Sequence, residues 1–225
     1  METRMETSKT GARENILARI ARANARPRPA SPPVVPLDAI FPPINNPRQR
    51  FLDECAGNLT EVFQTADAAG SADALKTILS TVPPGEIYVQ NDAEAWGNIN
   101  VALHSLTDAL KQWRSVRFSS EGAPAETTQA SLTLAHGLVA QTGSILTSSA
   151  CGGRGASIVP PCHIVYARGG QIVPDIAAAL ARIPLEIPAA SYVGLITGSS
   201  RTADIEKILV QGAHGPRRLV VILEG

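Results

Sequence analysis

Short apolar runs alternate with segments of helical spacing along most of this 225-residue chain, and this alternation constrains the fold more than any other feature. Parallel strands need long crossover connections, so apolar strands separated by amphipathic helices predict a mainly parallel sheet covered on both faces. The fold class expected is therefore α/β, with helices flanking the sheet. The predicted strands are 85–90, 115–120, 144–149, 163–167, 192–197 and 218–224.

Helices are predicted where apolar residues recur every three or four positions. This pattern covers Phe51 to Phe63 and Leu75 to Val82, and it returns at 101–113, 127–140, 174–183 and 200–208. The segment 208–213 fits either a continuation of the last helix or a terminal hairpin. The thirteen residues "ACGGRGASIVPPC" are barely enough for a crossover helix, so a single helical turn or an irregular loop is expected there.

The N-terminal region predicts an arm. Residues 9–26 form a short helix pattern whose thin apolar stripe, Ile16, Leu17 and Ile20, needs a partner surface. Residues 26–47 hold eight of the 17 prolines, which favours an extended strap. We place the boundary near residue 36, with an arm and strap over 1–36 and the α/β domain over 37–225. The first fifty residues carry +5 and the remainder −5, so docking of the arm on the body of its own chain or of a neighbouring one is electrostatically reasonable.

Composition excludes several classes of function. Zero net charge gives no general argument for binding nucleic acid or an anionic membrane. No apolar run approaches the roughly 20 residues of a membrane helix, and the N-terminus lacks the apolar core of a signal peptide. The three cysteines have no CxxC spacing, which argues against a disulfide framework and against a cluster bound by this chain alone. A cytoplasmic protein with neither metal nor cofactor of its own is expected.

Ligands of open α/β sheets bind beyond the carboxyl ends of the strands. The loops expected there are Asn91 to Trp96, Ser119 to Glu126, Ser149 to Gly155 and Thr197 to Thr202. The last has two interpretations: Gly198 and the hydroxyls of Ser199, Ser200 and Thr202 suit a carboxylate or phosphate, or Ser200 or Thr202 is only a helix N-cap.

The other candidates are weaker. In "CGGRG", Gly153 and Arg154 suit an anion clamp, or the segment is a plain flexible loop. Glu121 is a possible base or nucleophile, although a solvated loop glutamate is commoner. The histidines show no metal-ligand spacing, and helical His104 and His136 are expected to be structural. His214 lies in a turn by composition and is a candidate for either a site or a cap.

The stretch "ITGSSRTADIEKILVQGAHGPRRLVVIL", residues 196–223, resembles the C-terminal signature of the LUD-domain family, LutC/YkgG type. "AQTGSILTS" and "PPCHIVYARGGQIVPDIAAALARI" are similar to the family's pattern as well. The sequence departs at Ser199, where the family usually has proline. The resemblance extends from about residue 85 to the end and implies a NagB/RpiA/CoA-transferase-like fold. It makes Gly198, Thr202, Asp204, Glu206, His214 and Gly215 site candidates by motif, alongside Ser199, Ser200, Arg201, Gly153 and Arg154.

The resemblance also implies a role in L-lactate utilisation, in which such proteins act with iron–sulfur partner proteins to oxidise lactate to pyruvate. Under that division the iron–sulfur clusters belong to the partners, and residues 197–204 hold a small carboxylate or contact a partner. Alternatively, the chain is a free-standing enzyme of the CoA-transferase-like group, with Glu121 as nucleophile and Gly153, Arg154 and Ser200 holding anionic groups. A regulatory binding role without chemistry is a third interpretation.

Overall fold

A computed structural model describes residues 11–25, 42–91, 106, 108, 110, 115–186, 190–203, 209–211 and 215–225. Only the backbone is described for 184–186, 201–203 and 209–211. The chain divides into two compact units, Met1–Pro42 and Pro43–Gly225. Asp204, Glu206, His214 and His104 lie outside the described residues. None of the described helices is long and apolar enough to cross a membrane.

The first unit contains the predicted N-terminal helix, α1 (Ala12–Asn24). None of its residues is buried, and the side chains of its apolar stripe are about half exposed. The Glu14 carboxylate accepts a hydrogen bond from the Gly11 backbone N–H at the first turn, 3.1 Å away. The helix therefore forms as the sequence predicts, with its stripe uncovered.

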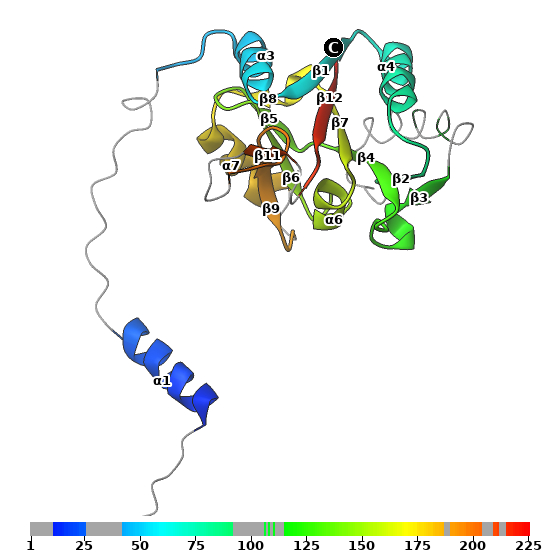
Figure 1. Ribbon diagram of the computed structural model, residues 1–225. Coiled ribbons are helices and arrows are strands. Elements are labelled where there is room, and N and C mark those ends of the chain that lie inside the picture. The colour runs from blue at the N-terminus through cyan, green and yellow to red at the C-terminus, as the bar shows by residue number, and fades with distance from the viewer. Residues whose placement is uncertain are drawn as a thin grey trace, which may run out of the picture. The chain divides into compact units, whose positions relative to one another are not determined.

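The second unit is organised around a six-stranded sheet in which every neighbouring pair is parallel (Figure 1). This confirms the predicted α/β class. The strands, in spatial order, are β1 (Thr60–Thr65), β12 (Arg218–Glu224), β7 (Cys162–Arg168), β4 (Thr128–Leu134), β2 (Glu86–Val89) and β3 (Val116–Phe118).

Both faces of this sheet are covered. On one face lies α4 (Ala68–Ser80), together with helical residues Leu106 and Leu110. On the other face lie α3 (Pro47–Gly57), the short helix α6 (Gly153–Ile158) and a second sheet. The five central residues of β12, Leu219 to Leu223, are all completely buried. A strand apolar on both sides is typical of the centre of a parallel sheet.

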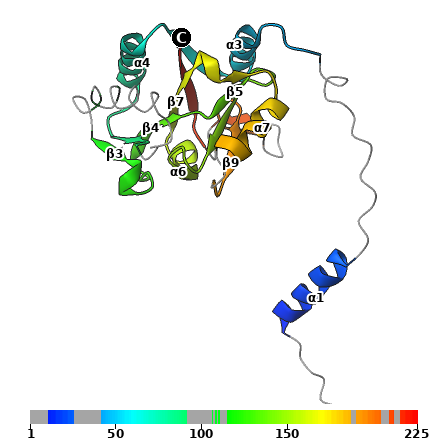
Figure 2. The same ribbon diagram turned by 180° about the vertical axis from the view of Figure 1, so that it is seen from behind.

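The second sheet has the order β8 (Ile172–Val173), β5 (Gly137–Val139), β6 (Ser144–Ser148), β9 (Val193–Ile196). Its inner side packs on the parallel sheet, and α7 (Ile176–Glu186) packs on its outer side, as Figure 2 shows from behind. Strand β9 pairs antiparallel with β6, so it runs back toward the end of the domain where β12 begins.

The helix predicted over 127–140 is wrong, because these residues form strands β4 and β5. Strand β4 does alternate polar and apolar residues from Gln129 to Leu134, the period of a strand, so the helix prediction overlooked a signal that the sequence carries. Its polar side chains also have internal partners. The Ser131 hydroxyl donates to the Ala156 carbonyl at 2.6 Å, and the Thr133 hydroxyl lies 2.8 Å from Nε2 of His163.

The helical pattern over 51–63 is wrong in its second half. Helix α3 ends at Gly57, and β1 begins at Thr60. Between them Leu59 has a φ of 59°, in the left-handed region that favours glycine, and its side chain is 57% exposed. One strained residue thus turns the chain from helix to strand, so both elements contribute apolar residues to the same core cluster.

We expect Leu59→Gly to raise the free energy of unfolding by about 1 kcal/mol, because glycine adopts this φ without a Cβ clash. Leu59→Ala keeps the clash and is the matched control. Urea unfolding followed by circular dichroism measures both variants. Equal stability of the two variants would contradict the strain.

Candidate functional site

The two halves of the signature motif pack against each other. Gly198 has a φ of 75° and Gly215 a φ of 118°, both in the region that favours glycine. The backbone N–H of Ser200 donates to the Pro216 carbonyl at 2.8 Å. A Cβ on Gly215 would lie 3.2 Å from the Ser200 Cβ. Tertiary structure therefore joins "TGSS" and "GP", which lie about fifteen positions apart in the chain.

The expected helix over 200–208 is wrong for its first residues. Arg201–Ala203 form strand β10, which pairs antiparallel with β11 (Leu209–Gln211). Arg201 faces Gln211 in the register, and Thr202 faces Val210. Leu209–Gln211 therefore form a strand rather than a continued helix, but this strand pairs with β10 before it and does not start a terminal hairpin, because β12 pairs with β1 and β7. Because Thr202 lies within a strand, it does not cap a helix.

The signature loop is not at the carboxyl edge of the parallel sheet, which corrects the expectation for Thr197 to Thr202. Strand β9 precedes this loop and belongs to the second sheet. The loop instead lies beside Pro216, at the amino end of β12, where the Arg218 N–H donates to the Pro161 carbonyl ahead of β7. The Thr197 hydroxyl lies 2.6 Å from the Ser144 hydroxyl, which ties the loop to β6. Placement by strand order failed because the strands of the described residues divide among three sheets.

A layer of buried polar side chains lies on the face of the parallel sheet toward α6 and the second sheet. Thr60, Leu219 and His163 are in register across β1, β12 and β7. Nδ1 of His163 and the Thr60 hydroxyl are buried without a hydrogen-bond partner. Burial lowers the pKa of His163 to about 4, so its imidazole is neutral at pH 7. Sequence reasoning missed this layer, because a hydroxyl or histidine in an apolar run gives no sign of its partners.

Ser199 is also buried, with 5% of its surface exposed, and it belongs to the signature loop. The loop thus contributes a hydroxyl-bearing side chain to the interior rather than presenting all its hydroxyls to solvent. With Gly198 and Gly215 setting the backbone, this region suits recognition of a small polar group by a few fixed donors and acceptors.

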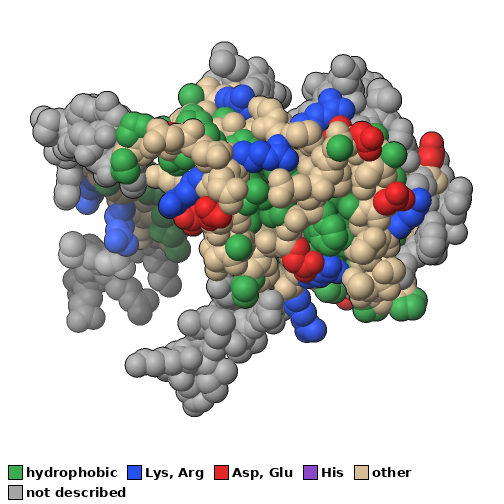
Figure 3. Space-filling view, turned by 90° about the horizontal axis from the view of Figure 1, so that it is seen from above, with side chains coloured by type: hydrophobic (Ala, Val, Ile, Leu, Met, Phe, Trp, Pro, Cys, Tyr) green, Lys and Arg blue, Asp and Glu red, His purple; other side chains and the backbone are tan. Residues whose placement is uncertain are grey.

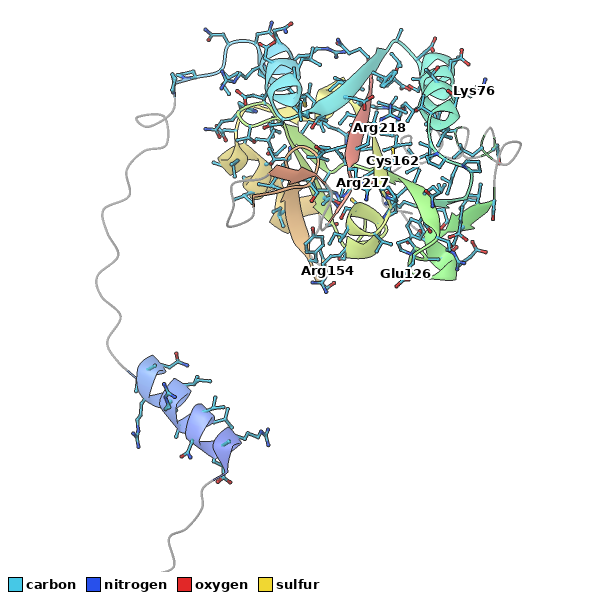
Figure 4. The ribbon with its side chains drawn as sticks, in the orientation of Figure 1. Lys76, Glu126, Arg154, Cys162, Arg217 and Arg218 are labelled. Carbon is cyan, nitrogen blue, oxygen red and sulfur yellow. The ribbon has the colours of Figure 1, made fainter. Side chains whose placement is uncertain are left out.

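Gly153 and Arg154 lie elsewhere. Gly153 begins α6 with a φ of 76°, and the Arg154 guanidinium stacks over the Tyr192 ring, 5.8 Å from its centroid. Figure 4 shows Arg154 pointing outward at the rim of the domain. Tyr192 immediately precedes β9, whereas Ser199 and Ser200 follow it. One four-residue strand, about 13 Å at 3.3 Å per residue, therefore separates the two groups of candidates.

Three of the four predicted loops, those that begin at Asn91, Ser119 and Ser149, come together at the carboxyl ends of β2 and β4. The Gln90 side chain is completely buried, accepts the Leu134 N–H at 2.9 Å and donates to the Ala150 carbonyl at 2.6 Å. The Asn91 carboxamide oxygen accepts from the Ser119 hydroxyl and the Ser120 N–H. From here the connection after β2 leads to the face covered by α4, and the connection after β4 leads to the face covered by the second sheet. The side-chain amides of Gln90 and Asn91 at this point are hydrogen-bonded within the protein.

His136 stands beside this junction, in the bend between β4 and β5 rather than on a helix. Its Nε2 lies 2.6 Å from the Ser148 hydroxyl, whose oxygen accepts the Ala150 N–H. Burial lowers the pKa of His136 to about 4, so a neutral ring can accept the hydroxyl proton. Ser148 is completely buried, which makes this pair a support for the Ala150 turn rather than an exposed nucleophile.

Glu121 is occupied locally. Its carboxylate accepts the Phe118 N–H at 2.6 Å, and the residue is exposed in a 3-10 turn. This geometry favours the solvated-loop interpretation over the nucleophile. Cys151 is 1% exposed, which favours a passive thiol. Among the described residues, no group of three or more His, Cys, Asp or Glu could hold a metal ion.

The class defined by this architecture is an α/β protein with a parallel sheet backed by a second sheet and a C-terminal signature hairpin. Residues 48–223 match the LUD domain family model, and the chain belongs to the LUD domain family. It is 30% identical to lactate utilization protein C of Bacillus velezensis over 183 residues, which cover 76% of this chain and 75% of that protein.

Other relatives and a solved structure support the same family and fold. Lactate utilization protein C of Bacillus subtilis is 28% identical, over 93% of this chain and 95% of its own. The uncharacterized protein YkgG of Escherichia coli is 34% identical over 39% of this chain and 40% of its own. A crystal structure of a DUF162 family protein from Deinococcus radiodurans has the same fold, with a TM-score of 0.56 and 19% identity over 80% of this chain and 96% of that one.

Gly215→Ala tests the packing of the signature. The Ala methyl would meet Ser200, and alanine rarely adopts a φ of 118°, so we expect a loss of about 1–3 kcal/mol in the free energy of unfolding. Gly170→Ala is the matched control, because its Cβ would meet no atom within 4 Å. Denaturant unfolding compares the two, and a control variant as unstable as Gly215→Ala would argue against the steric explanation.

The two buried histidines predict acid sensitivity. Their folded pKa of about 4 lies below the unfolded value of 6.5, so the unfolded chain binds more protons between these pH values. The free energy of unfolding should therefore reach its highest value above pH 6.5 and decrease toward pH 4, by up to about 3 kcal/mol per histidine. Unfolding curves over this pH range measure the slope. It should be shallower in His163→Gln, and an unchanged slope would contradict the assignment.

Proposed function

We propose that this protein is a non-redox subunit of an L-lactate utilisation system, in which lactate is oxidised to pyruvate together with iron–sulfur partner proteins. The observation that carries the proposal is membership of the LUD domain family over residues 48–223, with relatives named lactate utilization protein C. The match spans both halves of the signature region, which the structure brings into contact.

The cysteines support a division in which the clusters belong to the partners. Cys55 on α3 packs in the core on one face of the parallel sheet, and Cys162 on β7 packs in the core on the other. Burial raises the pKa of Cys55 to about 12 and that of Cys162 to about 11, which disfavours the thiolate that a metal requires. This burial supports the proposal that the clusters belong to the partner chains.

The contribution of this chain would be recognition at the signature region. A small carboxylate such as lactate, or a segment of a partner, would meet the backbone set by Gly198 and Gly215 and the candidate side chains of the motif. The neutral imidazole of His163 and the hydroxyl of Thr60 offer buried polar atoms not yet hydrogen-bonded. Unsatisfied polar atoms inside a protein are costly, by about 1–3 kcal/mol each, which favours an additional polar partner in this layer.

Figure 4 places Arg217 and Cys162 near the start of β12 and β7, the end of the sheet where the signature loop lies. Arg218 itself is occupied, because its guanidinium pairs with both oxygens of the Glu61 carboxylate at 2.6 and 2.7 Å. Arg217 is exposed at the same end of the sheet.

Deletion of the gene should abolish lactate-dependent dye reduction in lysates of lactate-grown cells, and the gene supplied in trans should restore it. An anaerobic pull-down of the tagged chain should bring iron and cysteine-rich proteins into the eluate. Unchanged dye reduction after deletion would refute the proposal. Within the recovered complex, Asp204→Ala should lower dye reduction at least tenfold without loss of iron, with Glu126→Ala, on a loop outside the signature, as the control.

A further inference from the structure

Helix α1 presents apolar side chains that no described residue of its own unit buries. Ile16, Leu17 and Ile20 are 55%, 52% and 50% exposed. They account for three of the eight large hydrophobic residues recorded as exposed in the described part of the chain. Ile20 lies four positions after Ile16 and three after Leu17, and residues at these spacings are neighbours on a helix, so the three side chains form one stripe. Such a stripe on a short element marks an interaction surface.

The helix is too short to be ordered by its own hydrogen bonds. Isolated helices below about 12–15 residues are marginal in water, and α1 has 13 residues. Its N-terminal support is local: Glu14 accepts the Gly11 N–H, and Gly11 itself has no side chain with which to cap the helix. A partner that covers the stripe would supply the stability that the helix lacks.

Charge defines the chemistry of that partner. At 100° per residue, Arg13 lies in line with the stripe, and Arg22 and Ala18 lie on the opposite side. Ile16, Arg19, Ile20 and Ala23 together line a shallow hollow, so a second guanidinium borders the apolar surface. The carboxylate of Glu14 is turned to the helix start. The complementary surface is therefore an apolar groove with carboxylates on its rim.

We propose that α1 is a docking helix, which inserts its stripe into an acid-rimmed apolar groove on one of the iron–sulfur partner proteins. The identity of the partner rests on the function proposed above. A protein groove fits better than a lipid surface, because interfacial membrane helices keep their charged residues on the face opposite the apolar one. The stripe is also interrupted by Arg13, which a carboxylate in a groove can pair.

The test measures anaerobic binding of the full chain to the purified iron–sulfur proteins of the same lactate-utilisation system, each with its clusters intact. Ile16→Asp and Ile20→Asp should weaken binding at least tenfold. Ala18→Asp adds the same charge to the same helix on the opposite side and should change the dissociation constant less than twofold. Equal dissociation constants for all these variants and the parent chain would overturn the docking role of α1. The proposed function would still stand in that case, because the chain would bind the iron–sulfur proteins.

A charge-reversal pair isolates the electrostatic part. Arg13→Glu should weaken binding at least fivefold and remove much of its salt dependence, whereas Arg22→Glu should have little effect. The helix dipole favours an acid near the N-terminus and disfavours one in the last turn, so loss of helix would give the reverse order. Weaker binding by Arg22→Glu than by Arg13→Glu would therefore overturn the proposed contact.

Two further outcomes are decisive. If the parent chain binds none of the iron–sulfur proteins, the partner named here is wrong; the dye-reduction assay then shows separately whether the role in lactate utilisation also fails. The second outcome concerns vesicles with 30% phosphatidylglycerol. If the parent chain binds these vesicles but no iron–sulfur protein, and the same variants lose vesicle binding, the stripe is a lipid-binding surface and the protein-groove proposal is refuted.

Discussion

The architecture of the domain depends on the parallel pairing of its last strand, β12, with β1 and β7. This strand contributes five completely buried residues and joins residues 60–65 to the C-terminal end of the chain. Its carboxyl end is fixed by polar contacts: Glu224 accepts from the Tyr166 and Ser71 hydroxyls, and the Arg48 guanidinium donates to the Gly225 carbonyl. In Figure 3, basic and acidic side chains are interspersed over this side of the molecule.

The same strand positions the signature. Because β12 begins directly after Pro216, the hydrogen bond from the Ser200 N–H to the Pro216 carbonyl connects the hairpin region to the central pairing of the sheet. A ligand or partner at the signature would therefore act on the amino end of the sheet. Docking through α1 would add a second contact on a separate unit, and two moderate contacts joined by one chain bind more tightly than either alone.

Sequence patterns predicted most of the strands and the helices α1, α4 and α7, because short apolar runs and amphipathic periods reflect local burial. They failed at 127–140, where the polar and apolar residues of β4 alternate from Gln129 to Leu134 and the period of a strand was overlooked. They failed again at Leu59, where a leucine adopts a conformation expected of glycine. Gly198 was predicted correctly as a position of special backbone geometry, whereas the buried His163 and Gln90 were not among the candidates.

The sequence by itself determined the α/β class, the separate basic helix with its apolar stripe, and membership of the LUD domain family, because composition, periodicity and a long motif are properties of the chain. Only the tertiary structure decided that the described strands divide among three sheets and that the signature loop therefore lies at the amino end of β12. It also decided that Arg154 and Ser200 are kept apart by β9. These outcomes depend on which strands pair, and pairing between distant segments is governed by contacts that no local pattern encodes.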